Sequence, residues 1–497
     1  MKNIMKVFAV IAILCAFSTL CRADLAPLKV EGSNLVADGH VVRLRGIDWG
    51  WWHVKATKYG ESDMRDQARW GANVARLCIS YTDVEDPNHL GQLDESRVKD
   101  IDQVVAWAKK YDQYVIIDMH VAPGGQDTQA YCDGGKNLLW TNAQDQQRLI
   151  SLWGALARRY RDDPTVAAYE IMNEPCTQGR PALLLSIDKR VLAAIRAEDP
   201  DKVVVIGGDQ WSGPTELTDA FKFDDPNILY TFHFYIGLPP QKWLSNAPEG
   251  AGISGTRDWT KIDVPINVPP NAISMTLLLR SNDNSGTAWF DDVALTDSSG
   301  NVVNQYAFDN DTQQFHVERA PTSVGAYDPT VGHDKPGSLK VSGTTSYDGF
   351  ISKPITVSPG RQYHLSAWVK LDHATGRTYL SAAFFGITSN TVDPASLLKL
   401  MQPAADFAKK YDVPVWVGEF GCQVNGLPSG LQENWVHAAI SAFEADKFDW
   451  TYWNFREASG PLGMALHAEH GEDGSDYPVN EALLQTLEDG WKLNSRS

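Results

Sequence analysis

Short apolar segments of strand length recur along this chain, and stretches with a helical apolar period separate them. The predicted strands lie in Val42–Ile47, Asn73–Ile79, Tyr114–His120, Ala168–Pro175, Lys202–Ile206, Ile228–Tyr235, Val413–Gly421 and Asp449–Phe455. Strands that alternate with helices predict a parallel sheet. Eight such units predict an α/β fold, a closed (β/α)8 TIM barrel.

One region interrupts this pattern. Far more residues separate Tyr235 from the helix predicted between Asp393 and Tyr411 than a barrel loop needs. The composition there changes to alternating strands, such as Ser274–Arg280, and to turns rich in Ser, Thr, Asn, Asp and Gly. We therefore predict an all-β jelly-roll module over residues 246–392. It is inserted after the sixth strand of a catalytic barrel formed by residues 24–245 and 393–497.

The first residues have the pattern of a targeting segment. Lys2 and Lys6 precede an apolar run from Val7 to Leu20, and Cys21–Ala23 ends in a small residue suited to cleavage. This pattern predicts a secretory signal peptide over residues 1–23, because the run is too short to span a membrane. A lipoprotein signal at Cys21 is less favoured, because Leu20 is bulky. We expect a secreted or periplasmic protein.

The chain is acidic. Its formal net charge is −18, and loss of Lys2, Lys6 and Arg22 with the signal peptide changes this by three, to −21. Such a surface repels nucleic acid and anionic membranes. The 17 tryptophans and 17 tyrosines supply flat rings that cover sugar faces well. We therefore expect a neutral carbohydrate partner, no nucleic-acid or membrane partner, and a monomer.

Four cysteines follow the predicted signal peptide: Cys78, Cys132, Cys176 and Cys422. They are too few for a disulfide scaffold, and no CxxC pair indicates a metal. Cys132 and Cys176 follow the third and fourth predicted strands, so we expect their loops to meet and to be bridged. Cys78 and Cys422 are expected to be small buried residues.

Two predicted strands deliver a glutamate at their carboxyl ends, where barrel enzymes place their chemistry. Glu174 precedes Pro175, which is expected to end the strand and to restrain Glu174 to an extended conformation. Glu419 ends the seventh strand. Two carboxylates of this kind suit glycoside hydrolysis, one as acid and the other as nucleophile or base.

Residues 25–243 and 393–490 resemble glycoside hydrolase family 5, a retaining family of the (β/α)8 barrel clan A. The resemblance rests on an ordered set of strand-end residues: Arg76, His120, Asn173–Glu174–Pro175, His233, Tyr235, Glu419 and Trp453. It implies that Glu174 is the general acid and then the base, and that Glu419 is the nucleophile. No metal or organic cofactor is implied.

The resemblance also implies supporting roles. Arg76 keeps Glu419 ionised and Tyr235 donates a hydrogen bond to it, whereas Asn173 suits the sugar 2-OH. His120 and His233 shape the hydrogen bonds around the reacting sugar, and Trp453 forms the floor of its subsite. Asp118 is interpreted as a buried structural acid.

Further aromatic residues are candidates for sugar stacking or for ordinary packing. They are Trp49, Trp52, Trp140 and Trp211.

The inserted module has its own resemblance. Gly286–Leu295 resembles the closing strands of a family 4/9/22-type carbohydrate-binding jelly roll, and Ser338–Val341 and Pro359–Lys370 resemble its opening strands. The reversed order indicates a circular permutation. We hypothesise that the module packs on the barrel as a rigid wall of the cleft. Its acidic residues could hold calcium, although solvated turn acids are favoured: Asp291, Asp292, Asp309 and Asp311.

Together these features predict a retaining β-glycosidase that acts on a β-linked oligo- or polysaccharide, with cellulose-type β-1,4-glucan as the first expectation. Asp118–Gln126 also resembles the exo-β-1,3-glucanases of the same family. This keeps an exo-β-1,3-glucanase or β-glucosidase open, together with a β-mannanase. The alternative outside the enzymes is a non-catalytic carbohydrate-binding protein.

Overall fold

The computed structural model describes residues 25–50, 52, 59–318, 324–344, 348–422, 427–456, 465–466 and 479–496. The predicted signal peptide, residues 1–23, lies outside them. No helix in this described part of the chain is long and apolar enough to cross a membrane.

Eight parallel strands form the predicted closed barrel. In barrel order they are β4 (Arg45–Trp49), β5 (Val74–Ser80), β6 (Tyr114–Val121), β7 (Val166–Glu170), β8 (Val203–Gly207), β9 (Ile228–Phe234), β21 (Val415–Phe420) and β22 (Asp449–Tyr452). Their residues are buried on both faces, which explains the continuous apolar runs in the sequence. The predicted TIM barrel is confirmed.

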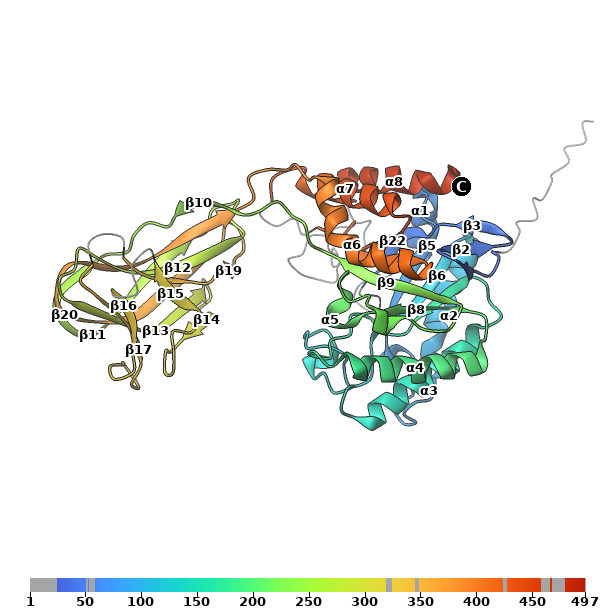
Figure 1. Ribbon diagram of the computed structural model, residues 1–497, viewed down its shortest axis with the longest axis horizontal. Coiled ribbons are helices and arrows are strands. Elements are labelled where there is room, and N and C mark those ends of the chain that lie inside the picture. The colour runs from blue at the N-terminus through green and yellow to red at the C-terminus, as the bar shows by residue number, and fades with distance from the viewer. Residues whose placement is uncertain are drawn as a thin grey trace, which may run out of the picture.

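Helices surround the barrel, as Figure 1 shows. They are α1 (Glu61–Trp70), α2 (Glu95–Lys110), α3 (Ala143–Tyr160), α4 (Pro181–Glu198), α5 (Asp209–Ser212), α6 (Pro394–Tyr411), α7 (Leu431–Ala445) and α8 (Glu481–Trp491). Local capping sets several starts: Asp94 accepts from the N–H of Ser96, and Asn142 from that of Gln144. Short 3₁₀ turns are η2 (Tyr81–Asp83), η3 (Asp133–Gly135), η4 (Asp219–Phe221) and η5 (Lys492–Arg496).

Two predicted strands differ in their limits. Val42 belongs to a small antiparallel sheet of β1 (Lys29–Glu31), β2 (Asn34–Ala37) and β3 (His40–Val42), so the first barrel strand starts later. Gly46 in that strand lies against β5, where an added Cβ would stand 1.9 Å from the carbonyl oxygen of Val74. The fourth barrel strand ends at Glu170, so Glu174 lies beyond it.

The predicted all-β module follows the sixth barrel strand. Its strands are β10 (Lys242–Asn246), β11 (Ile253–Asn267), β12 (Ser274–Asn282), β13 (Thr287–Asp297), β14 (Val302–Tyr306), β15 (Phe315–Glu318), β16 (Gly325–Asp328), β17 (Ser338–Ser342), β18 (Gly349–Ser352), β19 (Ile355–Thr356) and β20 (Gln362–Gly386). The long β20 pairs with β10, β11, β12 and β13 and so joins most of the module. The module has a core of its own, which includes Leu277, Phe290 and Val369.

Figure 1 shows this module to one side of the barrel, with two connecting segments between them. The hypothesis that it packs on the barrel as a rigid wall is not supported by this arrangement.

The acidic residues of the module cap turns or pair with basic side chains. Asp309 contacts Lys335 at 3.1 Å, and Asp311 accepts from the N–H of Gln313. Asp292 contacts His333 at 2.8 Å, and Asp291 accepts from the backbone N–H of His333. Solvated or paired acids therefore describe these residues better than one calcium cluster.

A buried acid lies behind the loop that carries Glu174. Asp188 of α4 faces a cavity of about 10 Å³ lined by Ile171, Met172 and Pro175. It has no hydrogen bond or ion pair to any described residue, and burial raises the pKa of its carboxyl well above the usual value. The folded protein therefore keeps this group protonated where the unfolded chain releases the proton.

We expect Asp188→Asn to flatten the pH dependence of stability. Because the folded pKa is raised, the wild type loses stability as pH rises from about 4, the unfolded pKa, through the folded pKa. Each tenfold difference between the folded and unfolded acid dissociation constants corresponds to about 1.4 kcal/mol of this loss. Melting temperatures should therefore agree near pH 4 and favour the variant at pH 8. Asp162→Asn, at an exposed position, is the matched control. Equal pH profiles for Asp188→Asn and the wild type would contradict this account.

Candidate active site

The two predicted catalytic glutamates lie together at the carboxyl ends of β7 and β21. Nδ1 of His233 is 2.8 Å from Oε1 of Glu174 and 3.5 Å from Oε2 of Glu419. One oxygen of each carboxylate and one ring nitrogen of His233 all lie within 4.8 Å of one another. The Glu174 side chain is 18% exposed and that of Glu419 only 5%. Both carboxylates can thus address one bond, with Glu174 nearer to solvent.

The backbone at Glu174 differs from the sequence prediction. Its φ is 40°, in the left-handed region, whereas Pro175 was expected to hold it extended. That prediction is wrong, because contacts around the loop outweigh the local preference. Asn173 donates its backbone N–H to the carbonyl oxygen of Met119, and the carbonyl oxygen of Pro175 accepts from the N–H of Trp211. Non-glycine residues held in this region cluster at functional sites.

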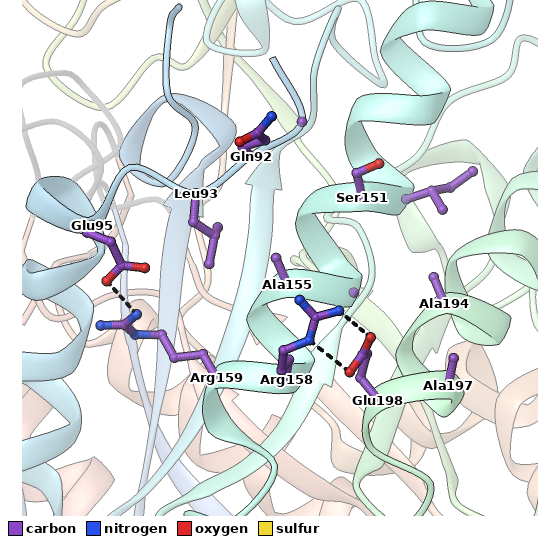
Figure 2. Close-up of a pocket in the computed structure, with 13 residues that line it drawn as sticks. Gln92, Leu93, Glu95, Ser151, Ala155, Arg158, Arg159, Ala194, Ala197 and Glu198 are labelled. Carbon is purple, nitrogen blue, oxygen red and sulfur yellow. Dashed lines mark hydrogen bonds and ion pairs between the residues drawn. The ribbon is translucent and has the colours of Figure 1, made fainter. Parts of the chain in front are cut away.

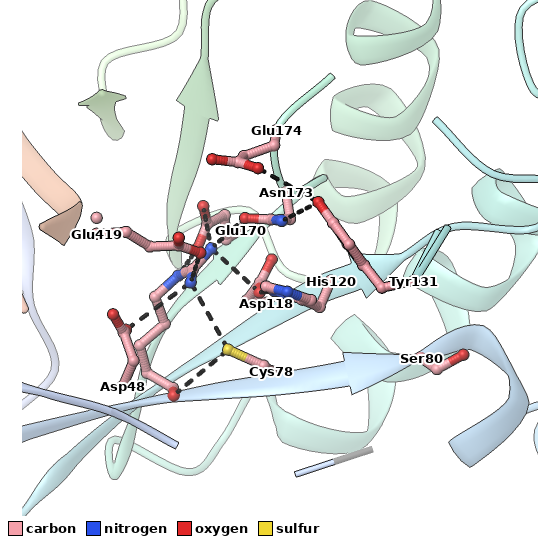
Figure 3. Close-up of polar contacts among 12 residues, drawn as sticks. Asp48, Cys78, Ser80, Asp118, His120, Tyr131, Glu170, Asn173, Glu174 and Glu419 are labelled. Atoms are coloured by element: carbon pink, nitrogen blue, oxygen red, sulfur yellow. Dashed lines mark hydrogen bonds and ion pairs between the residues drawn. The ribbon is translucent and has the colours of Figure 1, made fainter. Parts of the chain in front are cut away.

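Arg76 organises the buried part of the site, and Figure 3 shows the carboxylates that gather there, Asp48, Asp118, Glu170 and Glu419. Its Nη1 lies 2.7 Å from Glu419, and its Nε and Nη2 lie 2.6 and 3.1 Å from the two oxygens of Glu170. Nη2 also donates to Oδ1 of Asn173 at 2.8 Å. Arg76 is completely buried. Arg76 therefore orients the carboxylates and the Asn173 amide from inside the protein, and its contact with Glu419 is the one that the resemblance implied.

One guanidinium faces four carboxyl groups here, so the charges cannot all balance. Besides Glu419 and Glu170, Asp118 lies 3.1 Å and Asp48 3.8 Å from Arg76. Burial raises the pKa of Asp118 and of Glu170 to about 7, and that of Asp48 well above its usual range. Burial would also raise the pKa of Glu419, but the charges of His233 and Arg76 lower it to about 2. The surroundings thus select Glu419 as the ionised carboxylate.

Both oxygens of Glu419 have a donor. Arg76 holds Oε1, and the phenol of Tyr235, just after β9, donates to Oε2 at 2.7 Å. Burial raises the pKa of Tyr235 well above its usual value, so the phenol keeps its proton. For His233, burial would lower the pKa, but Glu419 and Glu174 raise it. These contacts agree with the supporting roles predicted for Tyr235 and His233.

His120 and Trp453 form one side of the site. Nδ1 of His120 lies 2.8 Å from Asp118, and the His120 ring stacks on Trp453 with centroids 5.4 Å apart. Burial lowers the pKa of His120 to about 4, so the imidazole is neutral near pH 7. Asp118 is a buried structural acid, as predicted.

Two of the four further tryptophans do not line the site. Trp49 is buried, donates to Gln67 at 2.8 Å and stacks on Tyr59. Trp140 is buried and donates to Asn137 at 2.8 Å. Of the two alternatives, ordinary packing therefore applies to both: Trp49 is the last residue of strand β4, and both rings lie in the core.

The other two tryptophans, Trp52 and Trp211, differ in exposure. Trp52 is buried, and residues 51 and 53–58 beside it lie outside the described part of the chain. Trp211 is 38% exposed on a turn where residues 210–212 all have positive φ. The role of Trp211 in sugar stacking therefore stays a prediction.

The predicted Cys132–Cys176 bridge is wrong. Both are buried free thiols with different partners: Sγ of Cys132 lies 2.9 Å from Oε1 of Gln126, and Sγ of Cys176 lies 3.9 Å from Oε1 of Gln210. Cys78 and Cys422 are buried, as predicted.

Sequence reasoning missed several residues of the site. Glu170 was visible as an acid within an apolar strand, and Asp48 as an acid at the end of another. Tyr131 and Asp127 carry no such signal, because they lie in the long loop after β6 whose path only the fold determines. The prediction that no metal takes part stays a prediction.

A surface pocket of about 720 Å³ lies outside the barrel, between α2, α3 and α4 (Figure 2). Small residues of α3 and α4 line it, and the ion pairs Arg158–Glu198 and Arg159–Glu95 cross it. It shares no residue with the catalytic pair.

A parallel eight-stranded barrel with one ionised and one solvent-facing glutamate at its strand ends defines the class of glycoside hydrolase barrels. Residues 35–261 match the family model described as "Cellulase (glycosyl hydrolase family 5)", and residues 300–385 match a "Carbohydrate binding domain". The resemblance to glycoside hydrolase family 5 seen in the sequence is therefore confirmed over these residues.

The chain is also similar to individual proteins. The chain is 32% identical over 178 residues to "Endoglucanase C" of Acetivibrio thermocellus, which covers 35% of this chain and 50% of that protein. It is 29% identical over 265 residues to "Beta-xylosidase" of Phanerodontia chrysosporium, which covers 45% and 55%. The chain thus spans about half the length of the curated relatives it matches.

A solved structure titled "Crystal Structure of Hyperthermophilic Endo-beta-1,4-glucanase in complex with substrate" is similar with a TM-score of 0.51 and 15% identity. The match covers 90% of this chain and 96% of that one. At this identity the similarity supports the fold alone.

Proposed function

We propose that this chain is a retaining glycoside hydrolase that cleaves β-linked glucan, with β-1,4-glucan as the preferred substrate. The observation that carries the proposal is the pair Glu174 and Glu419, whose nearest oxygens lie within 4.8 Å. Inverting enzymes keep their carboxyl groups about 6.5–9.5 Å apart to admit a water, whereas retaining ones keep them about 5–5.5 Å apart.

The first step follows from the charges in the site. Glu419 is ionised, and its carboxylate attacks the anomeric carbon while the bond to the leaving oxygen breaks. Glu174 delivers its proton to that oxygen, and a glycosyl–Glu419 ester remains. Asn173, whose Oδ1 is held by Arg76, can turn its amide N–H toward the sugar 2-OH.

The second step reverses these roles. Glu174 takes a proton from water, the hydroxide attacks the anomeric carbon, and Glu419 leaves as a carboxylate. Two inversions give net retention. A non-catalytic carbohydrate-binding protein would need neither the buried Arg76 nor the two donors on Glu419.

The substrate part of the proposal is supported by the relatives named as endoglucanases. A chain-end mode is the second candidate, because one relative is named a β-xylosidase and the long loop after β6 is tied to the acid loop. The side-chain amide of Gln126 donates to the carbonyl oxygens of both His120 and Asn173. Such a loop can close one end of a cleft.

The signal-peptide pattern of residues 1–23 supports export to the periplasm or the medium.

The test is the first-formed product on cello-oligosaccharides, followed by NMR. We expect the β-anomer to appear first and to mutarotate later. Initial α-anomer would exclude the retaining mechanism. The same enzyme preparation is then tested on oligosaccharides of β-1,4-glucan, β-1,3-glucan and mannan. The products identify the preferred linkage and show whether the enzyme cleaves from chain ends.

A further inference from the structure

The loop between β6 and α3 places a phenol on the catalytic acid. The Tyr131 hydroxyl lies 3.3 Å from Oε2 of Glu174 and 2.9 Å from Oδ2 of Asp127. It also lies 3.5 Å from the amide nitrogen of Asn173. Figure 3 shows the Tyr131 ring reaching over His120 toward Asn173 and Glu174. Tyr131 thus stands between the acid and a second carboxylate that no mechanistic step yet uses.

The two oxygens of Glu174 meet different partners. His233 contacts Oε1 through Nδ1 at 2.8 Å, and Tyr131 contacts Oε2. During turnover Glu174 alternates between a protonated acid and an ionised base. A phenol suits both states, because it can accept a hydrogen bond from a carboxylic acid or donate one to a carboxylate.

Asp127 is what allows the phenol to change direction. It is buried, and its other oxygen accepts from the backbone N–H of Gln129. Burial raises the pKa of Asp127 to about 6 and that of Tyr131 well above its usual value. The phenol therefore keeps its proton and can point it to either carboxylate.

We propose that Tyr131, held by Asp127, is a positioning residue that stabilises Glu174 in both of its protonation states. This inference rests on the proposed function. In the free enzyme the Glu174 O–H donates to Tyr131, whose own O–H donates to Asp127. When substrate binds, the Glu174 O–H turns to the leaving oxygen, and Tyr131 still donates to Asp127. Once Glu174 has given its proton to the leaving oxygen, the Tyr131 O–H rotates to Oε2 of Glu174, and Asp127 keeps the N–H of Gln129. No proton is gained or lost by Tyr131 in the cycle.

The variant Tyr131→Phe tests this with two leaving groups. With cello-oligosaccharides, which need the acid, kcat/KM should fall about 10- to 100-fold, the range expected for one lost hydrogen bond to a charged group. With 2,4-dinitrophenyl β-glucoside or cellobioside the first step needs little proton donation. There kcat/KM should stay near the wild-type value, while kcat and KM fall together because the second step becomes limiting. A merely structural defect would lower kcat/KM equally for both substrates.

Two further variants sharpen the test. Asp127→Asn keeps an acceptor for the phenol and should change the same parameters in the same direction, but less. Tyr81→Phe is the matched control, because Tyr81 contacts Asp133 of the same loop at 3.5 Å. It should behave as wild type. Equal losses on both substrates, or no loss in Tyr131→Phe, would overturn the proposal. An inactive wild type on every β-glycoside would instead contradict the proposed function.

Discussion

Glu419→Gln should lower kcat/KM by about 10⁴-fold or more on every substrate, which corresponds to about 5.5 kcal/mol of lost transition-state stabilisation. The amide cannot form the glycosyl ester, and the other acids near Arg76 cannot replace it. Asp118, Glu170 and Asp48 are buried deeper and have raised pKa values. Activity on activated aryl glycosides should be lost as completely as activity on oligosaccharides. A good leaving group replaces the need for the acid but not the need for the nucleophile.

The measurement is initial-rate kinetics on 2,4-dinitrophenyl β-cellobioside and cellotetraose, with circular dichroism to check folding. Glu198→Gln is the matched control, since Glu198 only pairs with Arg158 on the surface and should keep full activity. Wild-type turnover by Glu419→Gln on either substrate would overturn the assignment of the nucleophile and with it the mechanism.

Glu174→Ala should separate the two steps of the reaction. Activity on cello-oligosaccharides should fall about 10³- to 10⁴-fold, at the upper range for general acid–base catalysis. Formation of the glycosyl–enzyme from the dinitrophenyl substrate should persist, because that leaving group needs no proton. The second step should become slow, and the intermediate should accumulate as a burst followed by low turnover.

Rescue of Glu174→Ala by added azide is a result that only an acid/base role of Glu174 explains. Azide should enter the space left by Glu174, attack the anomeric carbon without base assistance, and restore turnover on the dinitrophenyl substrate. The product should be the β-glycosyl azide, with the Glu419 carboxylate released. Wild type should not respond. The absence of azide rescue, or an α-glycosyl azide, would be incompatible with Glu174 as acid/base in a retaining site.

Much of this architecture was predictable from local pattern. Continuous apolar runs indicated strands buried on both faces, and their carboxyl ends located Glu174, Glu419 and Tyr235 on one rim. Chain order was sufficient here, because a parallel barrel brings all its strand ends to the same face. The change to alternating polar and apolar residues likewise indicated the all-β module. The prediction that Arg76 ends the second strand is wrong, because β5 continues to Ser80 and Arg76 contacts Glu419 from within the strand.

Other features depended on contacts between segments far apart in the chain. Trp49 and Trp140 have the same side chain as Trp211, yet the first two are packed in the core and Trp211 is exposed. Their surroundings in the folded chain distinguish them, since Trp49 ends strand β4 whereas Trp211 lies on a turn. Likewise, Cys132 and Cys176 follow neighbouring strands, but hydrogen bonds to Gln126 and Gln210 turn their thiols toward different partners.

The sequence by itself determined which residues leave water and at which end of the barrel the acids gather, because burial follows the apolar period along each strand. Only the tertiary structure decided how those acids differ. Arg76 and His233 make Glu419 the ionised carboxylate, whereas Glu170, Asp48 and Asp118 share the same guanidinium. The left-handed turn at Glu174 and the nearby phenol of Tyr131 were decided there as well. Charge and hydrogen bonding act over a few ångströms in space, whatever the separation along the chain, so no local pattern records them.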